Sequence, residues 1–382
     1  MFNKKWVFWS ACLGILLFGI GLITLGSVVG DLKIKFNLDD ISSGTLFSIL
    51  PLGILIGSLV FGPICDKYGY KLLLSLSCIL MFIGFEGIAF APDLSLLRIC
   101  VFFFGLGAGS INGATNALVS DISETDKGAN LSVLGVFFGI GALGMPVVSG
   151  LLKGRVNFEV ILSGIGFITL MAGIFYMSIN FPAAKHKQGF PLRKSLSLFR
   201  DGLIVLIAFF LFFQSSFEAI INNWTTLFLL KHLSVSASDT LYALSLFVVG
   251  LTLMRLITGS VLRKINGLKI MFGSFCLTLA GLLMLKMGTS LGLAMTGLVL
   301  IGAGLAGGFP IMLGIVGSRY RELSGTAFSF VLVIALLGNM LINYGMGFIA
   351  QYFGVLHVVD VALIELLAMV VLCIFIQKID KI

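Results

Sequence analysis

The sequence predicts an all-α membrane protein with twelve transmembrane helices in two pseudo-symmetric halves of six. Three observations predict this fold class: the composition, twelve apolar runs, and a set of small residues that repeats along the chain. Of 382 residues, 58% are hydrophobic and 11% are charged, and the mean hydropathy is +1.12. Because so few polar side chains cannot cover a globule, we expect the surroundings of this chain to be lipid.

The apolar runs are each long enough to cross a bilayer, which takes about 20 helical residues. They cover residues 6–30, 41–65, 72–91, 94–120, 129–152, 157–181, 202–230, 239–262, 268–287, 289–317, 324–350 and 356–377. One long polar stretch divides six runs from six, so we predict an N-terminal half over 1–182, a cytoplasmic linker over 183–201 and a C-terminal half over 202–382. The linker mixes basic with apolar residues, which fits either a short amphipathic surface helix or a plain solvated connection.

The two halves carry a repeat. Gly62 and Gly259 lie 197 positions apart (259 − 62). The same separation joins Gly53 to Gly250, Gly105 to Gly302, Gly107 to Gly304, Gly128 to Gly325, Ser132 to Ser329 and Gly141 to Gly338. With 47 glycines in the chain one match would mean nothing, but seven at one offset indicate a duplicated six-helix unit.

The basic residues set the orientation. With the N-terminus inside, seventeen Lys and Arg fall in cytoplasmic segments and six in outer segments. The positive-inside rule therefore predicts that both termini are cytoplasmic. We expect a multi-pass monomer in the plasma membrane, most simply a bacterial inner membrane. The net charge of +8 lies in the loops, so no nucleic-acid partner is expected. The six cysteines form no C-x-x-C pair, so no metal and no cofactor are expected.

A charged turn separates the second run from the third. Five residues of this turn have an expected role: Gly62, Asp66, Lys67, Gly69 and Lys71. Gly62 allows close helix approach, Gly69 can take a positive φ, and the charges lie at the membrane surface. The pattern G-x-x-x-D-[RK]-x-G with a following basic residue resembles the loop between helices 2 and 3 of the major facilitator superfamily, although Tyr70 stands where that family often has Arg. An ordinary cytoplasmic loop is the alternative.

This resemblance implies the major facilitator fold, a transporter without enzymatic activity, and a substrate site between the halves near the bilayer midplane. The five residues of the turn then belong to a gate on the cytoplasmic side. Arg255, near the inner end of the eighth run, matches a basic residue seen there in the family and is assigned to the same gate.

Polar side chains form three stripes inside the apolar runs. They are Asn112 and Asn116; Gln214, Glu218 and Asn222; and Asn339 and Asn343. A spacing of four residues places each set on one helical face. Amides both donate and accept hydrogen bonds, which suits a neutral sugar, and Trp224 can stack on the apolar face of a sugar ring. The alternative is that these side chains tie helices together.

Four stretches narrow the resemblance to the fucose:proton symporter family, in particular its glucose- and galactose-handling branches. They are 105–116, the pair Glu218 and Trp224, 308–310, and 137–142. Two acidic residues of the fucose carriers fall at Gly26 and Asn112 here, so proton coupling needs another carboxyl group. Glu218, deep in its run, is the first candidate for proton coupling or for accepting a sugar hydroxyl, and Glu86 is the second.

The leading prediction is a secondary active transporter that imports a neutral sugar by proton symport through alternating access. Its partners are the lipid bilayer, a small-molecule substrate and a coupling proton or sodium ion. The alternative within the superfamily is a multidrug or metabolite efflux antiporter. Its support is a loose resemblance of Gly141, Gly144, Pro146 and Gly150 to the Gly-Pro motif of drug antiporters. A membrane enzyme would need clustered carboxylates or His, and the three His residues are isolated. The chain has no P-loop, so energy must come from a gradient or from exchange.

Overall fold

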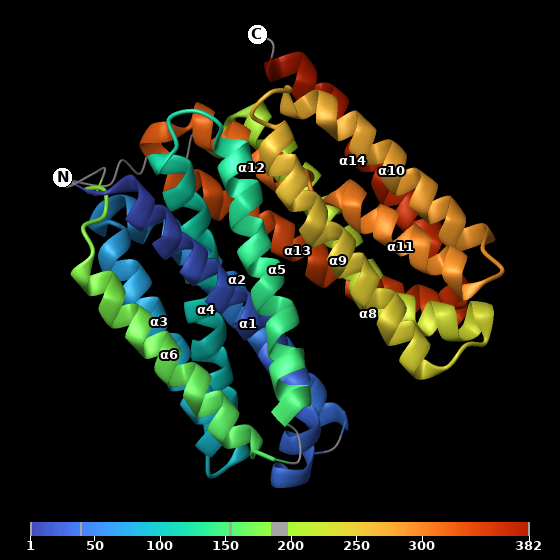
Figure 1. Cartoon of the computed structure of the whole chain (residues 1–382), viewed down its shortest axis with the longest axis horizontal. Coiled ribbons are helices and arrows are strands. Elements are labelled where there is room, and N and C mark those ends of the chain that lie inside the picture. Colours follow the sequence, from blue (N-terminus) through green and yellow to red (C-terminus); the bar gives the residue numbers. More distant parts are fainter. Residues whose placement is uncertain (1, 39, 153–154, 185–197, 381–382) are drawn as a thin grey trace. The chain divides into compact units, whose positions relative to one another are not determined.

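The computed structural model describes residues 2–38, 40–152, 155–184 and 198–380, and these are almost entirely helical (Figure 1). Within them, twelve helical stretches are long and apolar enough to cross a membrane, which confirms the predicted all-α membrane architecture. The helices are α1 Lys4–Phe36, α2 Asp40–Tyr68, α3 Tyr70–Phe90, α4 Leu94–Ile122, α5 Lys127–Leu152, α6 Phe158–Ser178, α8 Gly202–Leu233, α9 Ala237–Val261, α10 Gly267–Met287, α11 Leu291–Leu305, α12 Gly308–Arg319, α13 Ser324–Tyr352 and α14 Val358–Asp380. Short 3₁₀ turns cover Leu198–Arg200, Arg321–Leu323 and Val355–His357.

The tenth predicted span, 289–317, is two helices. α11 ends at Leu305 and α12 begins at Gly308, so the two helices together make one span, Leu291–Arg319, with a short break inside it. The predicted span over this run is confirmed, and the break inside it is an addition from the structure. Broken helices inside a membrane expose backbone groups that need partners from neighbouring residues.

The chain forms two compact units. The first comprises Met1–Ile122, Phe137–Leu192 and Tyr320–Ser329; the second comprises Ser123–Val136, Arg193–Arg319 and Phe330–Ile382. The start of α5 therefore belongs to the second unit and the start of α13 to the first. Residues 185–197 of the expected linker lie outside the described residues, and with them the amphipathic surface helix considered above.

Repeated glycines sit where helices cross closely. In the first unit, a Cβ atom on Gly105 would lie 2.5 Å from the Leu50 carbonyl oxygen, where α4 crosses α2. In the second unit, a Cβ on Gly250 would lie 2.5 Å from the Val299 carbonyl oxygen, where α9 crosses α11. Gly53 and Gly302 complete these two crossings, and a Cβ on either would collide with a backbone carbonyl.

A second pair of helix crossings is related by the same offset of 197 residues. A Cβ on Gly107 would lie 2.6 Å from the Ser77 carbonyl oxygen of α3, and a Cβ on Gly304 would lie 2.6 Å from the Ser274 carbonyl oxygen of α10. Both members of each pair are displaced by the same 197 positions (304 − 107 and 274 − 77). The repeat in the sequence is therefore a repeat of helix contacts.

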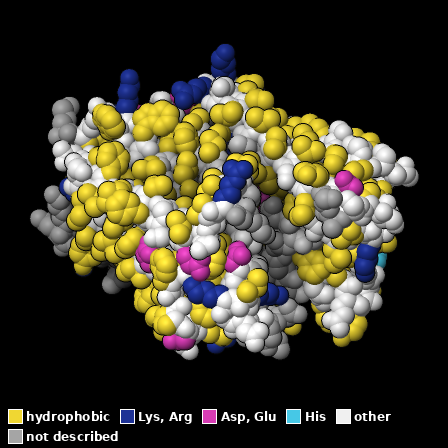
Figure 2. All heavy atoms as spheres, turned by 60° about the horizontal axis from the view of Figure 1, so that its bottom comes forward, with side chains coloured by type: hydrophobic (Ala, Val, Ile, Leu, Met, Phe, Trp, Pro, Cys, Tyr) yellow, Lys and Arg dark blue, Asp and Glu magenta, His cyan; other side chains and the backbone are white. Residues whose placement is uncertain are grey.

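Hydrophobic side chains also cover much of the outside of the molecule (Figure 2). Ile364 and Leu367 on α14 are 68% and 63% exposed, and Phe167 and Ile168 on α6 are each 58% exposed. Such a surface is stable only against lipid, because in water it would aggregate.

Candidate substrate-binding and gating residues

Gln214 lies at the break between α11 and α12. Its Nε2 donates to the Leu305 carbonyl at 2.9 Å, which supplies a partner to a backbone group at the end of α11. The side chain is fully buried, and its Oε1 has no hydrogen-bond partner among the described residues. A Cβ on Gly308 would collide with this amide, so a larger residue there would displace the Gln214 side chain from this position. The break in the span and the position of the Gln214 side chain therefore depend on each other.

Glu218 and Arg255 extend this site. Glu218 Oε1 accepts a hydrogen bond from Gln214 Nε2 at 3.2 Å, and the guanidinium of Arg255 is near enough to attract its charge. Arg255 Nη1 donates to the Gly135 carbonyl at 3.1 Å, so α9 is joined to the start of α5. We call Gln214, Glu218 and Arg255 the Glu218 cluster. The sequence assigned Arg255 to a gate, and the structure places it beside the candidate proton site.

A second polar group joins α8 to α13. Asn343 Oδ1 accepts from Asn223 Nδ2 at 2.9 Å and from Trp224 Nε1 at 3.3 Å. Asn343 Nδ2 donates to the Asn339 carbonyl at 2.8 Å. We call Asn223, Trp224, Asn339 and Asn343 the Asn343 cluster. Both ends of the Asn343 amide are engaged, so this residue holds two helices together as well as being a candidate ligand for substrate.

Asn223 was missed by the sequence analysis, which selected Asn222. The spacing of four residues from Glu218 led to Asn222, whose Nδ2 only donates to the Glu218 carbonyl of its own helix at 2.8 Å. The sequence signal for Asn223 was the run of three polar residues, 222–224, inside an apolar span. Because successive residues point in different directions around a helix, one of the three could reach a neighbouring helix even if Asn222 did not. A substrate role of Asn222 stays a prediction.

The first unit holds the pair on α4. From Gly107 to Ser120 every residue is buried except Asn112 and Asn116, which are half-buried. Asn116 Nδ2 donates to the Asn112 carbonyl at 2.8 Å and to its Oδ1 at 3.2 Å. Asn112 and Asn116 are therefore the accessible residues of this helical stretch. Their amide groups are of the kind that binds a polar ligand.

Glu86, the second proton candidate, lies in a helix contact of the first unit. Its Oε1 accepts a hydrogen bond from the Ser163 hydroxyl at 2.8 Å, which joins α3 to α6. This geometry gives Glu86 a packing role. Its proposed part in proton coupling has no further support here.

Asp66 binds the start of α13. Its carboxylate accepts from the Gly325 amide at 3.3 Å, the Thr326 amide at 3.0 Å and the Thr326 hydroxyl at 2.8 Å. Asp66 is 1% exposed, and Gly62 lies one turn away, where a Cβ would be 2.5 Å from the Gly325 carbonyl. An anion at a helix N-terminus satisfies free N–H groups and the helix dipole.

The other residues of the turn lie outside this contact. Gly69 has a φ of +85° between α2 and α3, which is the conformation expected for it. Lys67 and Lys71 are exposed, and the Lys67 ammonium lies 5.0 Å from the centre of the Tyr68 ring. Their part in gating stays a prediction.

The contact between α2 and the start of α13 has a counterpart in the second unit. Ser329 Oγ donates to the Ser58 carbonyl in the first unit, and Ser132 Oγ donates to the Arg255 carbonyl in the second. Both partners are displaced by 197 positions (329 − 132 and 255 − 58). The start of α13 on α2 thus repeats the start of α5 on α9.

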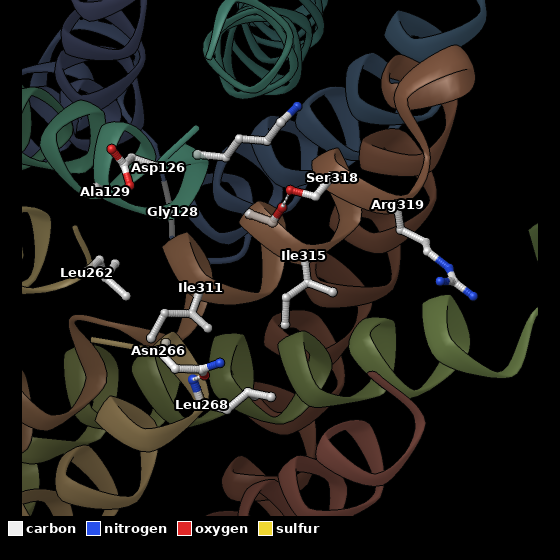
Figure 3. A pocket seen from close by; sticks show the side chains of 13 residues that line it. Asp126, Gly128, Ala129, Leu262, Asn266, Leu268, Ile311, Ile315, Ser318 and Arg319 are labelled. Carbon is white, nitrogen blue, oxygen red and sulfur yellow. Dashed lines mark hydrogen bonds between the residues drawn. The ribbon is translucent and has the colours of Figure 1, made fainter. Parts of the chain in front are cut away.

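A cavity of about 400 Å³ in the second unit is separate from these residues (Figure 3). Leu262, Leu268, Ile311 and Ile315 supply its apolar wall, and Arg319 points away from the other labelled side chains. Its polar groups are used locally, since Lys127 Nζ donates to the Gly317 carbonyl at 2.9 Å and Asn266 caps α10. The cavity contains none of the residues predicted to bind substrate.

The fold and these intramembrane polar groups define a multi-pass membrane transporter. The sequence matches the family described as Major Facilitator Superfamily over residues 11–342, so the chain belongs to that superfamily. This match confirms the resemblance drawn from the turn after α2.

Relatives and solved structures agree with this family. The chain is 23% identical to an uncharacterized transporter of the superfamily from Yersinia pestis, covering 90% of this chain and 88% of that one. It is 24% identical to the glucose/mannose transporter GlcP of Bacillus subtilis, covering 86% and 84%. Its fold matches the E. coli fucose:proton symporter FucP with a TM-score of 0.82 and 18% identity over 97% and 98% of the chains. It also matches the proton:xylose symporter XylE with a TM-score of 0.78 and 15% identity over 98% and 95%.

We expect Asp66→Asn to loosen the start of α13. An asparagine keeps one acceptor oxygen but turns an N–H group toward the amides of Gly325 and Thr326, so the local cap weakens by roughly 1 kcal/mol. Hydrogen exchange measured on peptides from residues 320–329 should become faster, while expression is nearly intact and transport slows. Lys67→Gln, on the same turn but outside the contact, should leave the exchange of these peptides unchanged; equal exchange in both variants would contradict the cap.

Proposed function

We propose that the protein is a secondary active transporter that imports a neutral sugar together with a proton. The observation that carries this proposal is the set of amide side chains inside the spans, on α4 in the first unit and on α8 and α13 in the second, where α8 also carries one carboxyl group and one indole. Polar side chains in a membrane are costly and mark transport sites or their supports. Amides and an aromatic face are what a ligand with many hydroxyls and no charge requires.

The named relatives support the same substrate class. Besides the glucose/mannose transporter, a D-xylose transporter of Levilactobacillus brevis is 28% identical over 132 residues, which is 35% of this chain and 29% of that one. For this chain, the basic loops support a plasma-membrane location with both termini in the cytoplasm. We keep the division into an N-terminal half, a linker and a C-terminal half, and the monomeric state, as parts of this proposal.

The contact of Asp66 with the start of α13 is the proposed cytoplasmic gate. Asp66 accepts its three hydrogen bonds from two backbone amides and one hydroxyl. When the gate opens, water can replace these neutral donors, and no oppositely charged partner is left buried and unpaired. Glycine at positions 62 and 325 keeps the contact close and leaves no interlocking side chain there. Arg255 supports the repeated contact at the start of α5.

Efflux of lipophilic compounds is the weaker alternative. Its support was the partial Gly and Pro motif of the fifth span. Gly141 has a packing reason of its own, because a Cβ there would collide with the Leu16 carbonyl, and its repeat partner Gly338 meets Phe212 in the same way. The motif therefore does not require an antiporter.

Four substitutions test the sugar site: Asn112→Leu, Asn116→Leu, Gln214→Leu and Asn343→Leu. Each removes hydrogen bonds with little change in size, so each should weaken sugar binding by roughly 1–3 kcal/mol if the side chain holds a substrate hydroxyl. Binding is measured by calorimetry on purified protein. Thr296→Val is the control, since its exposed hydroxyl bonds only to its own helix. Lower folding yield with unchanged affinity would instead show that these residues are helix ties.

Glu218→Gln tests proton coupling. Glutamine imitates the protonated carboxyl group but cannot ionise, so sugar should still bind and exchange in counterflow, while accumulation driven by a pH gradient disappears. If Glu218 only accepts a sugar hydroxyl, binding and exchange should weaken together and some driven uptake should persist. Proteoliposome assays decide between them, with Glu159→Gln, whose partner is Lys35, as the control. Full pH-driven accumulation in Glu218→Gln would exclude Glu218 as the obligatory proton site.

A further inference from the structure

Glu365 is a carboxyl group in the middle of an apolar helix. It lies on α14 between Ile364 and Leu366 and is only 4% exposed. Its Oε2 is buried and has no hydrogen-bond partner among the described residues. The hydroxyl of Ser216 on α8 is close enough to stabilise the charged form of Glu365. A charged carboxylate in such a place would lack compensation, so a structural role does not explain it.

Within the part of the chain that the structure describes, no charged side chain pairs with Glu365. The elements that pack on α14 include α8, α10 and the turn Val355–His357, and α13 is reached through Ser216. The titratable groups of these elements and of α14 whose side chains are described are Glu218, Lys231, His232, Lys269, Cys276, Lys286, Tyr344, Tyr352, His357, Asp360, Cys373 and Lys378.

Two of these carboxyl groups, Asp360 and Glu218, have partners elsewhere. Asp360, five residues before Glu365, binds Lys286 at 2.5 Å and His357 at 3.1 Å. Glu218 belongs to its own cluster with Gln214 and Arg255. Glu365 is therefore set apart from both networks.

Ser216 connects Glu365 to α13. Its Oγ donates to the Gly338 carbonyl at 3.2 Å, and Gly338 directly precedes Asn339 of the Asn343 cluster. The helices touch closely here, because a Cβ on Gly338 would collide with Phe212 of α8. A hydroxyl has a single hydrogen, so Ser216 can donate to Gly338 or to Glu365, but not fully to both.

We propose that Glu365 is a second proton-binding site, at which protonation decides whether Ser216 bonds to α13 or to α14. With a proton on Glu365, the carboxyl O–H donates to Ser216 Oγ and the serine hydrogen stays on the Gly338 carbonyl. Without that proton, the carboxylate takes the serine hydrogen, and the Gly338 carbonyl loses its link to α8. Proton binding is thereby connected to the helix that carries Asn339 and Asn343. This inference rests on the proposed proton-coupled transport.

The direct test is infrared spectroscopy on the full chain in lipid nanodiscs, titrated with acid and base without substrate. A protonated carboxylic acid has a carbonyl band that vanishes when the acid ionises. We expect a part of the titrating band to be absent from Glu365→Gln and still present in Glu218→Gln and Ser216→Ala. If Glu365→Gln removes no titrating component, the proposal is overturned. Loss of a band that does not change with pH would overturn it equally, because Glu365 would then be a permanently neutral residue.

The second test uses D-glucose as the probe. In Glu218→Gln, which removes the first proposed proton site, its affinity should still change with pH. Adding Glu365→Gln should hold the affinity at one value across the range in which the infrared band titrates, and a pH dependence that survives in this double variant would refute the link to the Asn343 cluster. If D-glucose does not bind the wild type, the proposed sugar specificity is in question, while the infrared titration still decides whether Glu365 takes up a proton.

Discussion

A backbone inside a lipid bilayer must find all its hydrogen bonds within the protein, and this constraint governs the whole chain. It makes every span a helix and makes any interruption dependent on a side chain that supplies the missing bond. The break between Leu305 and Gly308 is the clearest case, since Gln214 donates to the Leu305 carbonyl and lies in the space that a side chain at position 308 would occupy. The same Gln214 amide contacts Glu218, so the break and the candidate proton site depend on each other.

Lipid is as apolar as the helices, so the hydrophobic effect does not drive helices together inside a bilayer. Close packing of their backbones stabilises their association instead. Gly105 and Gly302 bring α4 and α11 against their neighbours at equivalent places in the two units. Polar side chains inside the spans are few, and several of them join one helix to another. Asp66 holds the start of α13, Arg255 holds the start of α5, and Asn343 holds α8. The groups proposed to bind substrate and protons are therefore also the groups that connect the helices.

The fold could be predicted from the sequence because span length, basic loops and the offset of 197 are local or periodic signals. The break after Leu305 could not, since an apolar Gly-rich run looks the same whether or not its helix is continuous. Asn223 was missed because helical spacing from Glu218 selected its neighbour, and only packing shows which of the two reaches Asn343. The motif assigned Asp66 to a gate, but its partner, the distant start of α13, could be identified only from the structure.

The central claim is that this transporter recognises a neutral sugar. Thermal unfolding of the purified protein against a panel of neutral hexoses and pentoses and of lipophilic cations tests it most directly, because a ligand that binds the folded state raises the unfolding temperature with its concentration. The account predicts a saturable rise with at least one sugar and no rise with the cations. A rise with lipophilic cations alone would contradict it and would indicate an efflux antiporter.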